Sequence, residues 1–263
     1  MENILKEFDS SDLAWSIFDL MYKDNIITFN KEDSNKNKRP CCISKFKYKG
    51  KETDEELNFS GDTDFNFKKG FAHSRLETYR NYIDKIYLDD KNKEDKYKKM
   101  YLQNLNVLTE LTHSILNISI MPQAGNLQAF KQGIGNDRLD TFIWAINEYY
   151  CNGIELLFNY STFYNVKYLK SYFELFSNVY EYCRVIYHID EGLVDDLIDL
   201  GKQSLNSPEK VIKFMNLAIR FFNQKANYLS TQLTNIKNEE LKKKIENNLS
   251  TCESTLDRLF SSN

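Results

Sequence analysis

Proline and glycine are scarce in this chain, with three prolines and nine glycines in 263 residues. So few turn-forming residues favour long regular elements over many tight turns. Long apolar runs are lacking as well, because no window approaches the roughly 18 consecutive apolar residues that mark a transmembrane helix. The start, Met-Glu-Asn-Ile-Leu-Lys-Glu-Phe-Asp, lacks the basic residues and apolar core of a signal peptide. We therefore expect a cytoplasmic protein without a membrane partner.

Cysteines are few and scattered, which limits metal and thiol chemistry. Of the five cysteines only Cys41 and Cys42 are close together, and no Cys-x-x-Cys spacing occurs. This pattern is typical of reduced cytoplasmic thiols and argues against a zinc site. No serine stands in a Gly-x-Ser-x-Gly motif, so the nucleophile elbow of many hydrolases is not indicated.

Charge is nearly balanced, since 35 basic residues oppose 38 acidic ones for a net charge of −3. Such a balance creates no strong global field and argues against non-specific wrapping of nucleic acid, although it leaves room for a local basic patch. Hydrophobic residues make up 41% and aromatic residues 14% of the chain, enough to build a sizeable core. The abundance of Asn, Lys, Ile and Tyr indicates an AT-rich bacterial genome.

The hydrophobic pattern predicts a mainly α fold with a small β element, in a single domain over residues 1–263. Residues 1–70 are rich in Lys, Asn, Asp and Glu with short apolar pieces, so we expect an irregular or β-containing N-terminal segment. Residues 71–263 form a helical, bundle-like body in this prediction, because apolar residues recur at helical spacing. One short buried strand, Ile115 to Met121, is expected within the body, ended by Pro122.

Several helices have clear boundaries in the sequence. A first helix is expected from Ser11 or Asp12 to Tyr22, and a long one from Val166 to Tyr187. Ser207-Pro208-Glu209 is a helix start signal, with serine as the cap, proline at the first helical position and then an acid. Two antiparallel helices, one ending near Ile236 and one from Glu239 to Phe260, are predicted to form a C-terminal helical hairpin.

The last helix of this hairpin repeats apolar residues along one side, from Leu241 to Leu259. We interpret this stripe as packing against the rest of the chain. The alternative is a dimerisation arm, which makes a homodimer a candidate assembly.

The segment from Met121 to Asp140 holds three of the nine glycines and leads into an amphipathic helix. Glycines let backbone N–H groups approach a ligand, and a helix N-terminus carries partial positive charge. We therefore take Gly133, Gly135 and Asn136 as candidate cofactor-binding residues. Their spacing matches neither a P-loop nor Gly-x-Gly-x-x-Gly, so it does not by itself indicate a nucleotide.

This segment ends in Asp137-Arg138-Leu139-Asp140 at the start of the helix. An arginine can bind a phosphate or a carboxylate through two parallel hydrogen bonds, and flanking aspartates can orient the ligand. Asp137, Arg138 and Asp140 are therefore the candidate catalytic residues. The alternative is structural, with Asp137 as the helix cap and Arg138 paired to an acid.

Asp62 and Asp64 are the candidate metal ligands, because two carboxylates at this spacing can share a divalent cation. Together with Asp137 and Asp140 they would make an acidic site for Mg²⁺ or Mn²⁺, which can support phosphoryl hydrolysis. The alternative is that these aspartates form a turn.

Arg184 and His188 lie one helical turn apart in the predicted long helix. The pair is similar to the arginine–histidine pair of a class of helical bacterial ribonucleases, in which more residues separate the two than the three found here. Surface or capping roles are the preferred interpretation of both side chains.

Residues 62–229 resemble a bacterial family of unknown function. The stretch Gly-Ile-Gly-Asn-Asp-Arg-Leu-Asp-Thr-Phe at 133–142 is similar to that family's Asp-Arg-Phe-Asp-Leu-Thr core. Residues 62–86 and 172–187 resemble its early Ser-x-x-Leu-x-x-Tyr stretch, in a shifted form, and its aromatic helix, whereas the family's tryptophan and lysine after the tyrosine are missing. The resemblance implies a role for Asp137, Arg138 and Asp140 but no particular activity.

These patterns predict a cytoplasmic bacterial protein that binds a phosphate-bearing ligand, a nucleotide or nucleic acid, at the 125–140 segment. A link to phage defence is a further hypothesis. The first alternative is a metal-dependent phosphodiesterase or nuclease that uses the same carboxylates. The second is a non-catalytic scaffold that dimerises through the C-terminal hairpin.

Overall fold

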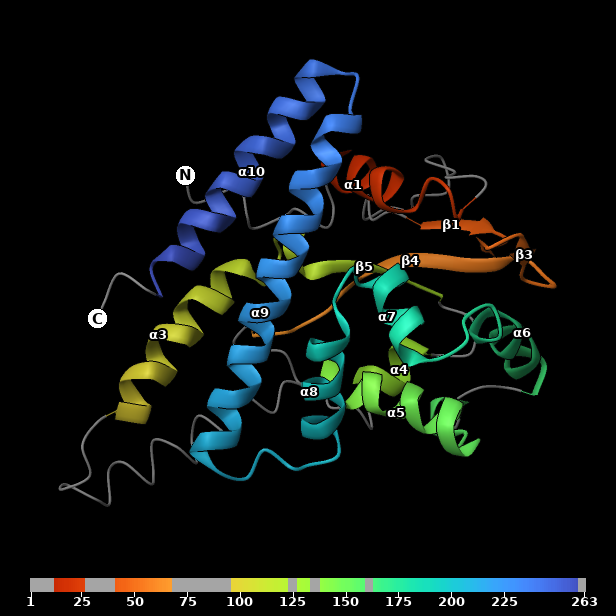
Figure 1. The fold of residues 1–263 in the computed structure, drawn as a ribbon, viewed down its shortest axis with the longest axis horizontal. Coiled ribbons are helices and arrows are strands. Elements are labelled where there is room, and N and C mark those ends of the chain that lie inside the picture. The colour runs from red at the N-terminus through yellow and green to blue at the C-terminus, as the bar shows by residue number, and fades with distance from the viewer. Residues whose placement is uncertain are drawn as a thin grey trace.

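A computed structural model of the chain describes residues 12–26, 41–67, 96–122, 127–132, 138–158 and 163–259. These residues are mainly helical with a small β element, so the predicted fold class is confirmed (Figure 1). The helices in chain order are α1 (Asp12–Tyr22), α3 (Lys96–Leu111), α4 (Leu127–Gln132), α5 (Leu139–Asn152), α6 (Phe163–Phe173), α7 (Val179–Ile186), α8 (Glu191–Gly201), α9 (Pro208–Gln232) and α10 (Glu239–Asp257), with 3₁₀ turns at Ile115–Asn117, Leu156–Phe158 and Leu233–Asn235.

A three-stranded antiparallel sheet joins the N-terminal third of the chain to its middle. The strands are β1 (Cys41–Ser44), β4 (Leu57–Thr63) and β5 (Ile118–Pro122), in the order β1-β4-β5. β4 is the central strand, and its register with β5 sets Asp62 opposite Ser119. The sheet therefore fixes where the polar end of β4 lies relative to β5.

The strand predicted at Ile115 to Met121 is shifted along the chain. Residues Ile115–Asn117 form a 3₁₀ turn because the Ser114 side chain accepts the backbone N–H of Leu116 at 3.3 Å. Pro122 belongs to the strand instead of ending it. β5 lies at the edge of the sheet, where a residue without a backbone N–H is tolerated.

A two-stranded hairpin lies at the edge of the molecule, close to the label β3 in Figure 1. Its strands are β2 (Lys47–Tyr48) and β3 (Lys51–Glu52), and its turn is Lys49-Gly50. Both turn residues have positive φ, 49° and 77°. Two successive residues in this region make the tight turn whose twist matches that of a β-hairpin.

Helices α9 and α10 form the predicted C-terminal hairpin, with α3 packed alongside (Figure 1). The start signal is confirmed, because Ser207 is the N-cap of α9, accepts the N–H of Lys210 at 3.4 Å and precedes Pro208 in the first turn. Asn238 caps α10 in the same way through the N–H of Leu241, at 3.0 Å.

The apolar side of α10 is buried within the chain, as predicted for packing inside the molecule. Ile245, Leu249, Cys252 and Leu256 are each no more than 3% exposed. The exposed apolar stripe that a dimerisation arm needs is therefore not present on these residues of α10.

The single helix expected from Val166 to Tyr187 is wrong, because the chain turns between Phe173 and Val179. The interruption contains no proline or glycine. It is stabilised instead by Asn178, whose side chain accepts the N–H of Glu181 at 2.9 Å and starts α7. A side-chain cap of this kind offers the backbone an alternative to continuing the helix.

Aromatic side chains join the strands to α6 and α7. The Phe46 ring lies 5.8 Å from Phe59 and 5.3 Å from Tyr172, and Tyr172 lies 6.2 Å from Tyr182, measured between ring centroids. All four rings are fully buried. The tyrosines of this region thus contribute to the core, in edge-to-face and tilted contacts.

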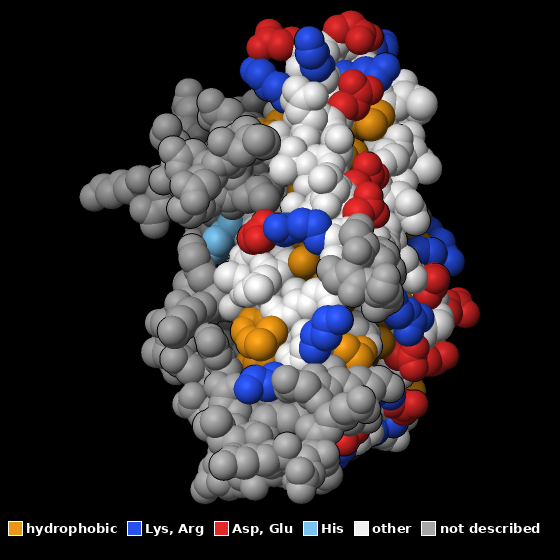
Figure 2. All heavy atoms as spheres, turned by 90° about the vertical axis from the view of Figure 1, so that its left-hand side faces the viewer, with side chains coloured by type: hydrophobic (Ala, Val, Ile, Leu, Met, Phe, Trp, Pro, Cys, Tyr) orange, Lys and Arg blue, Asp and Glu red, His pale blue; other side chains and the backbone are white. Residues whose placement is uncertain are grey.

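The surface carries charges of both signs. Figure 2 shows Lys and Arg side chains interspersed with Asp and Glu over the described part of one face, with hydrophobic side chains scattered among them. None of the helices that the structure describes is long and apolar enough to cross a bilayer.

Gly201, the last residue of α8, allows α8 to approach α5 closely. A Cβ atom at this position would lie 2.2 Å from the backbone oxygen of Asp140 and 2.8 Å from Cβ of Trp144. Replacing Gly201 with alanine should therefore lower the free energy of unfolding by about 2 kcal/mol, because the backbone of one helix must move. Urea denaturation measures this change.

The matched control lies on the same helix. A Cβ atom at Gly192 would meet only Asp190 Oδ1, at 3.6 Å. Gly192→Ala should leave the stability unchanged or raise it slightly, since alanine restricts the unfolded chain. Equal losses in the two variants would contradict the proposed close contact.

Candidate functional site

Arg138 and Asp140 form a buried ion pair at the start of α5. The Nε of Arg138 donates to Oδ1 of Asp140 at 3.0 Å, and Nη2 donates to Oδ2. The side chains are only 8% and 0% exposed. This is the two-bond geometry expected of an arginine clamp, but the clamped carboxylate belongs to the chain itself.

The same guanidinium binds the C-terminal end of α8. Nη2 donates to the carbonyl oxygen of Leu200 at 3.2 Å, and Nη1 donates to that of Gln203 at 3.0 Å. A cation at this position suits the helix dipole, and it adds to the backbone hydrogen bond that the carbonyl oxygen of Leu200 accepts from the N–H of Gln203 at 2.9 Å. Cζ also lies 5.7 Å from the centre of the Phe214 ring. Arg138 thus ties α5, α8 and α9 together.

Asp140 occupies the anion position at the N-terminus of α5. Burial raises the pKa of its carboxyl group, and the hydrogen bonds and charge of Arg138 oppose that rise. The backbone N–H groups of Thr141 and of Asp140 itself further favour the charged form. The carboxylate of Asp140, a residue of the chain itself, therefore supplies the negative charge at this helix N-terminus.

Asp62 forms a second ion pair, with Lys131 of α4. Nζ of Lys131 donates to Oδ2 of Asp62 at 2.8 Å and also to the carbonyl oxygen of Thr63. The lysine side chain is 1% exposed and that of the aspartate 11%. This pair fastens α4 to the end of β4.

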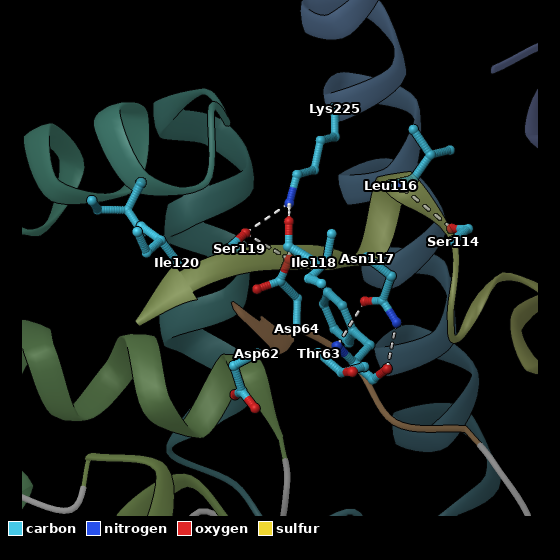
Figure 3. A network of polar contacts seen from close by, with 12 residues as sticks. Asp62, Thr63, Asp64, Ser114, Leu116, Asn117, Ile118, Ser119, Ile120 and Lys225 are labelled. Carbon is cyan, nitrogen blue, oxygen red and sulfur yellow. Dashed lines mark hydrogen bonds and ion pairs between the residues drawn. The ribbon is translucent and has the colours of Figure 1, made fainter. Parts of the chain in front are cut away.

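Asp64 belongs to a third, fully buried polar cluster (Figure 3). Nζ of Lys225, on α9, donates to Asp64 at 3.0 Å, to Ser119 Oγ at 2.7 Å and to the carbonyl oxygen of Ile118 at 2.6 Å. The Ser119 hydroxyl donates to Asp64 at 2.8 Å. Burial lowers the pKa of Lys225, and the charge of Asp64 opposes that change.

The two predicted metal ligands therefore do not face a common position. Figure 3 shows the carboxylates of Asp62 and Asp64 pointing apart, and each binds a different lysine. Among the residues that the structure describes, no group of three or more His, Cys, Asp or Glu side chains is arranged to hold a metal ion. An ammonium group in contact with each carboxylate competes with any cation for its oxygens, so this geometry does not favour the Mg²⁺ or Mn²⁺ hypothesis.

Gly133, Gly135, Asn136 and Asp137 lie outside the described residues. The structure does describe the residues on both sides of this segment. Lys131 before it and Arg138 after it are both held in buried ion pairs. Residues 133–137, the middle of the 125–140 segment, are therefore flanked along the chain by two residues held in ion pairs.

Arg184 and His188 do not form a joint site. α7 ends at Ile186, and Arg184 is 63% exposed and paired with Glu181 at 3.6 Å. His188 lies beyond the helix with φ 57°, and its ring stacks on Tyr228 of α9, with centroids 3.7 Å apart. The helical register that the ribonuclease-like spacing requires is thus lost.

The sequence analysis did not identify the two buried lysines, Lys131 and Lys225, although the position of Lys225 indicates its burial. Lys225 falls on the apolar side of α9, at the spacing set by Ala218, Phe222 and Leu229. A lysine within an apolar stripe indicates a buried charge with a partner. Its partners, Asp64 and Ser119, are too distant in sequence to be identified from spacing.

Breaking the Arg138–Asp140 pair should destabilise the fold strongly. Arg138→Met or Asp140→Leu alone leaves one buried charge uncompensated, so each should lower the free energy of unfolding by about 3–5 kcal/mol. The double variant should lose less than the sum, which a double-mutant cycle measured by urea denaturation reveals. Additive losses would show that the two side chains do not act as a pair.

His188 should make stability depend on pH. Burial and the charge of Lys225 lower the pKa of His188 to about 3, from an ordinary value of 6.5. Between these values the unfolded chain binds a proton that the folded chain does not, so the free energy of unfolding falls as pH falls, by about 1.4 kcal/mol per pH unit. Urea denaturation from pH 6.5 to 4.5 measures this slope.

His188→Asn supplies the control, because asparagine tolerates positive φ and does not titrate. The difference in stability between wild type and variant should narrow or reverse as pH falls through this window. Glu181, whose pKa is lowered from 4.5 to about 2, contributes only at lower pH. Parallel pH profiles for the two proteins would refute the assignment to His188.

Comparison with known proteins adds no relative: no known family, curated protein or solved structure matches this chain. The resemblance to a bacterial family of unknown function therefore stays a prediction. The three buried ion pairs are the structural features that bear on the function of this chain.

Proposed function

We propose that this chain binds a phosphate-bearing ligand, a nucleotide or nucleic acid, at the 125–140 segment. The supporting observation is the anchoring of residues 133–137 on both sides. Lys131 is tied to Asp62 of the sheet, and Arg138 is tied to Asp140 and to the end of α8. Binding segments are commonly short connections held by a rigid scaffold.

The cost of these anchors favours a positional role. A buried ion pair is often no better for stability than well-packed apolar residues of similar volume, because both charges must leave water. Two such pairs bracket one short glycine-bearing segment. The stability gained from two such ion pairs does not explain their position on both sides of residues 133–137. Accurate placement of these residues does explain it.

Arg138 takes a different part in this proposal from the one expected. Its guanidinium is engaged by Asp140 and by two carbonyl oxygens, so it positions the segment instead of contacting the ligand. Contact with the ligand falls to Gly133, Gly135 and Asn136, through backbone N–H groups and an amide side chain. Successive backbone N–H groups suit phosphate oxygens without requiring a side-chain cation.

The alternatives receive less support. The carboxylates that a metal-dependent phosphodiesterase would use are paired with lysines or with Arg138 where the structure describes them. The apolar stripe that a dimerising scaffold would use is buried on α10. A link to phage defence stays a hypothesis based on the apparent genome type and the resemblance to a family of unknown function.

Thermal denaturation in the presence of ligands tests the proposal. Nucleoside mono-, di- and triphosphates and inorganic phosphate are added separately, with EDTA present so that metal binding does not contribute. A ligand at about 100 times its Kd should stabilise the chain by about 2.7 kcal/mol and raise its Tm. Gly133→Ala combined with Asn136→Ala should abolish this shift.

Gly192→Ala is the matched control, because a methyl group added to this glycine of α8 would make only ordinary contacts. It should keep the full ligand-induced shift. The absence of a shift with every phosphate compound in the wild-type protein would refute the proposal, as would a shift that survives the substitutions at 133 and 136.

A further inference from the structure

The ring of His188 links the connection between α7 and α8 to two other helices. It stacks on Tyr228 of α9, with ring centroids 3.7 Å apart and ring planes 4° apart. The Tyr22 ring of α1 lies 5.8 Å from it. The φ of His188, 57°, lies in the left-handed region that most residues avoid, so the contact is made at some cost in backbone conformation. The stacked ring therefore holds this connection against α1 and α9.

Hydrogen bonds fix the chain on either side of His188. The carbonyl oxygen of Ile186, the last residue of α7, accepts the hydroxyl of Tyr22 at 2.6 Å. The backbone N–H of Asp190, the N-cap of α8, donates to Oε1 of Gln224 at 2.8 Å. The His188 side chain can therefore change position while the ends of both helices stay attached.

The surroundings of His188 suit a neutral ring and not a charged one. Its Nε2 atom is buried and has no hydrogen-bond partner among the residues that the structure describes. Burial and the positive charge of Lys225 both lower the pKa of His188. The carboxylate of Asp190 is already engaged at both oxygens, by the N–H of Leu193 at 2.8 Å and by Gln224 at 2.7 Å. An imidazolium would thus be a buried cation without an acceptor.

The tyrosines around the ring do not take up the proton. Burial raises the pKa of Tyr22 on α1 and of Tyr228 on α9, so both hydroxyl groups stay neutral. The exposed Asp24, just after α1, places its charge near the Tyr228 hydroxyl. Histidine is the side chain whose ordinary pKa lies closest to neutral pH, so a proton gained by this cluster on mild acidification goes to His188.

We propose that His188 is a pH-sensitive clasp within the folded chain. The neutral ring stacks on Tyr228 and holds the α7–α8 connection, and protonation releases the ring into water while the helices stay folded. This inference uses none of the residues of the 125–140 segment and stands independently of the function proposed there.

The magnitudes favour release over a charged ring that stays in place. Attraction between an imidazolium and a tyrosine ring strengthens a contact by about tenfold. Burial and Lys225 oppose the charge much more strongly, because a pKa lowered from 6.5 to about 3 corresponds to a factor of about 3,000. Each pH unit below 6.5 favours the released form by about tenfold.

Release is distinct from the loss of stability at low pH. That loss requires only that the unfolded chain binds the proton. Once the clasp has opened, the folded chain binds the same proton, so the free energy of unfolding should stop falling through this group below the pH of release.

NMR of the full chain with ¹³C-labelled histidine and tyrosine rings tests the proposal from about pH 7.5 to about pH 4. The variants His188→Asn and Tyr228→Phe identify the two ring signals by their loss. As pH falls, the Tyr228 signal should lose the shift that the stacked ring of His188 imposes, at the same midpoint as the His188 signal. Far-UV circular dichroism should stay unchanged across that midpoint.

His188→Asn is also the matched control, because asparagine tolerates positive φ and does not titrate. In this variant the Tyr228 signal should not change with pH. Titration of His188 with an unchanged Tyr228 signal would show that the charged ring stays stacked and would overturn the proposal. It would equally be overturned by a Tyr228 change that persists in His188→Asn, or by two ring signals that change only when the circular dichroism signal is lost.

Discussion

The contact of Arg138 with Asp140 and with the end of α8 is the constraint on which the centre of this structure depends. Asp140 supplies the anion at the start of α5, and the guanidinium of Arg138 donates to Asp140 and to the carbonyl oxygens of Leu200 and Gln203. Gly201 makes the contact possible, because any side chain there would collide with the backbone of Asp140. The start of α5 and the end of α8, two helices distant in sequence, are thereby held at a fixed separation. Arg138, which makes this contact, directly follows residues 133–137 in the chain.

Buried ion pairs occur at three places among the described residues of the fold. Asp62 with Lys131 and Asp64 with Lys225 each join elements that the apolar core already brings together. Arg138, paired with Asp140 at the start of α5, joins that helix to the end of α8 through the carbonyl oxygens of Leu200 and Gln203. Burial of both charges cancels much of the stability that such pairs provide, so their main effect is to select one arrangement of the elements. At the end of β4 that arrangement orients α4 and α9. A positional role for the charged motif explains its geometry better than direct contact with a ligand.

The sequence predicts this fold well where local chemistry decides the structure. Ser207-Pro208 marks the start of α9, and the apolar spacing from Leu241 to Leu259 identifies the buried side of α10, since both signals lie within one helix. The break before α7 was missed because a single capping side chain, Asn178, produces it without proline or glycine. The partners of Asp62 and Asp64 were missed for another reason: the sheet and α9 bring Lys131 and Lys225 to them from far along the chain. Spacing in one sequence carries no information about such encounters. The sequence allowed Arg138 either to bind a ligand or to pair with an acid of the chain. It did not identify the carboxylate that Arg138 binds.

Native-state hydrogen exchange tests most directly whether Arg138 couples the two helix ends. The amide of Phe142 donates to the carbonyl oxygen of Arg138 at 3.2 Å, and that of Gln203 donates to Leu200 at 2.9 Å, whereas the amide of Leu259 reports the distant end of α10. In Arg138→Met the account predicts faster exchange at the amides of Phe142 and Gln203 together. Exchange at the amide of Leu259 should change only by the amount that the loss of global stability produces. Unchanged protection at Phe142 and Gln203, or a loss confined to one of them, would contradict it.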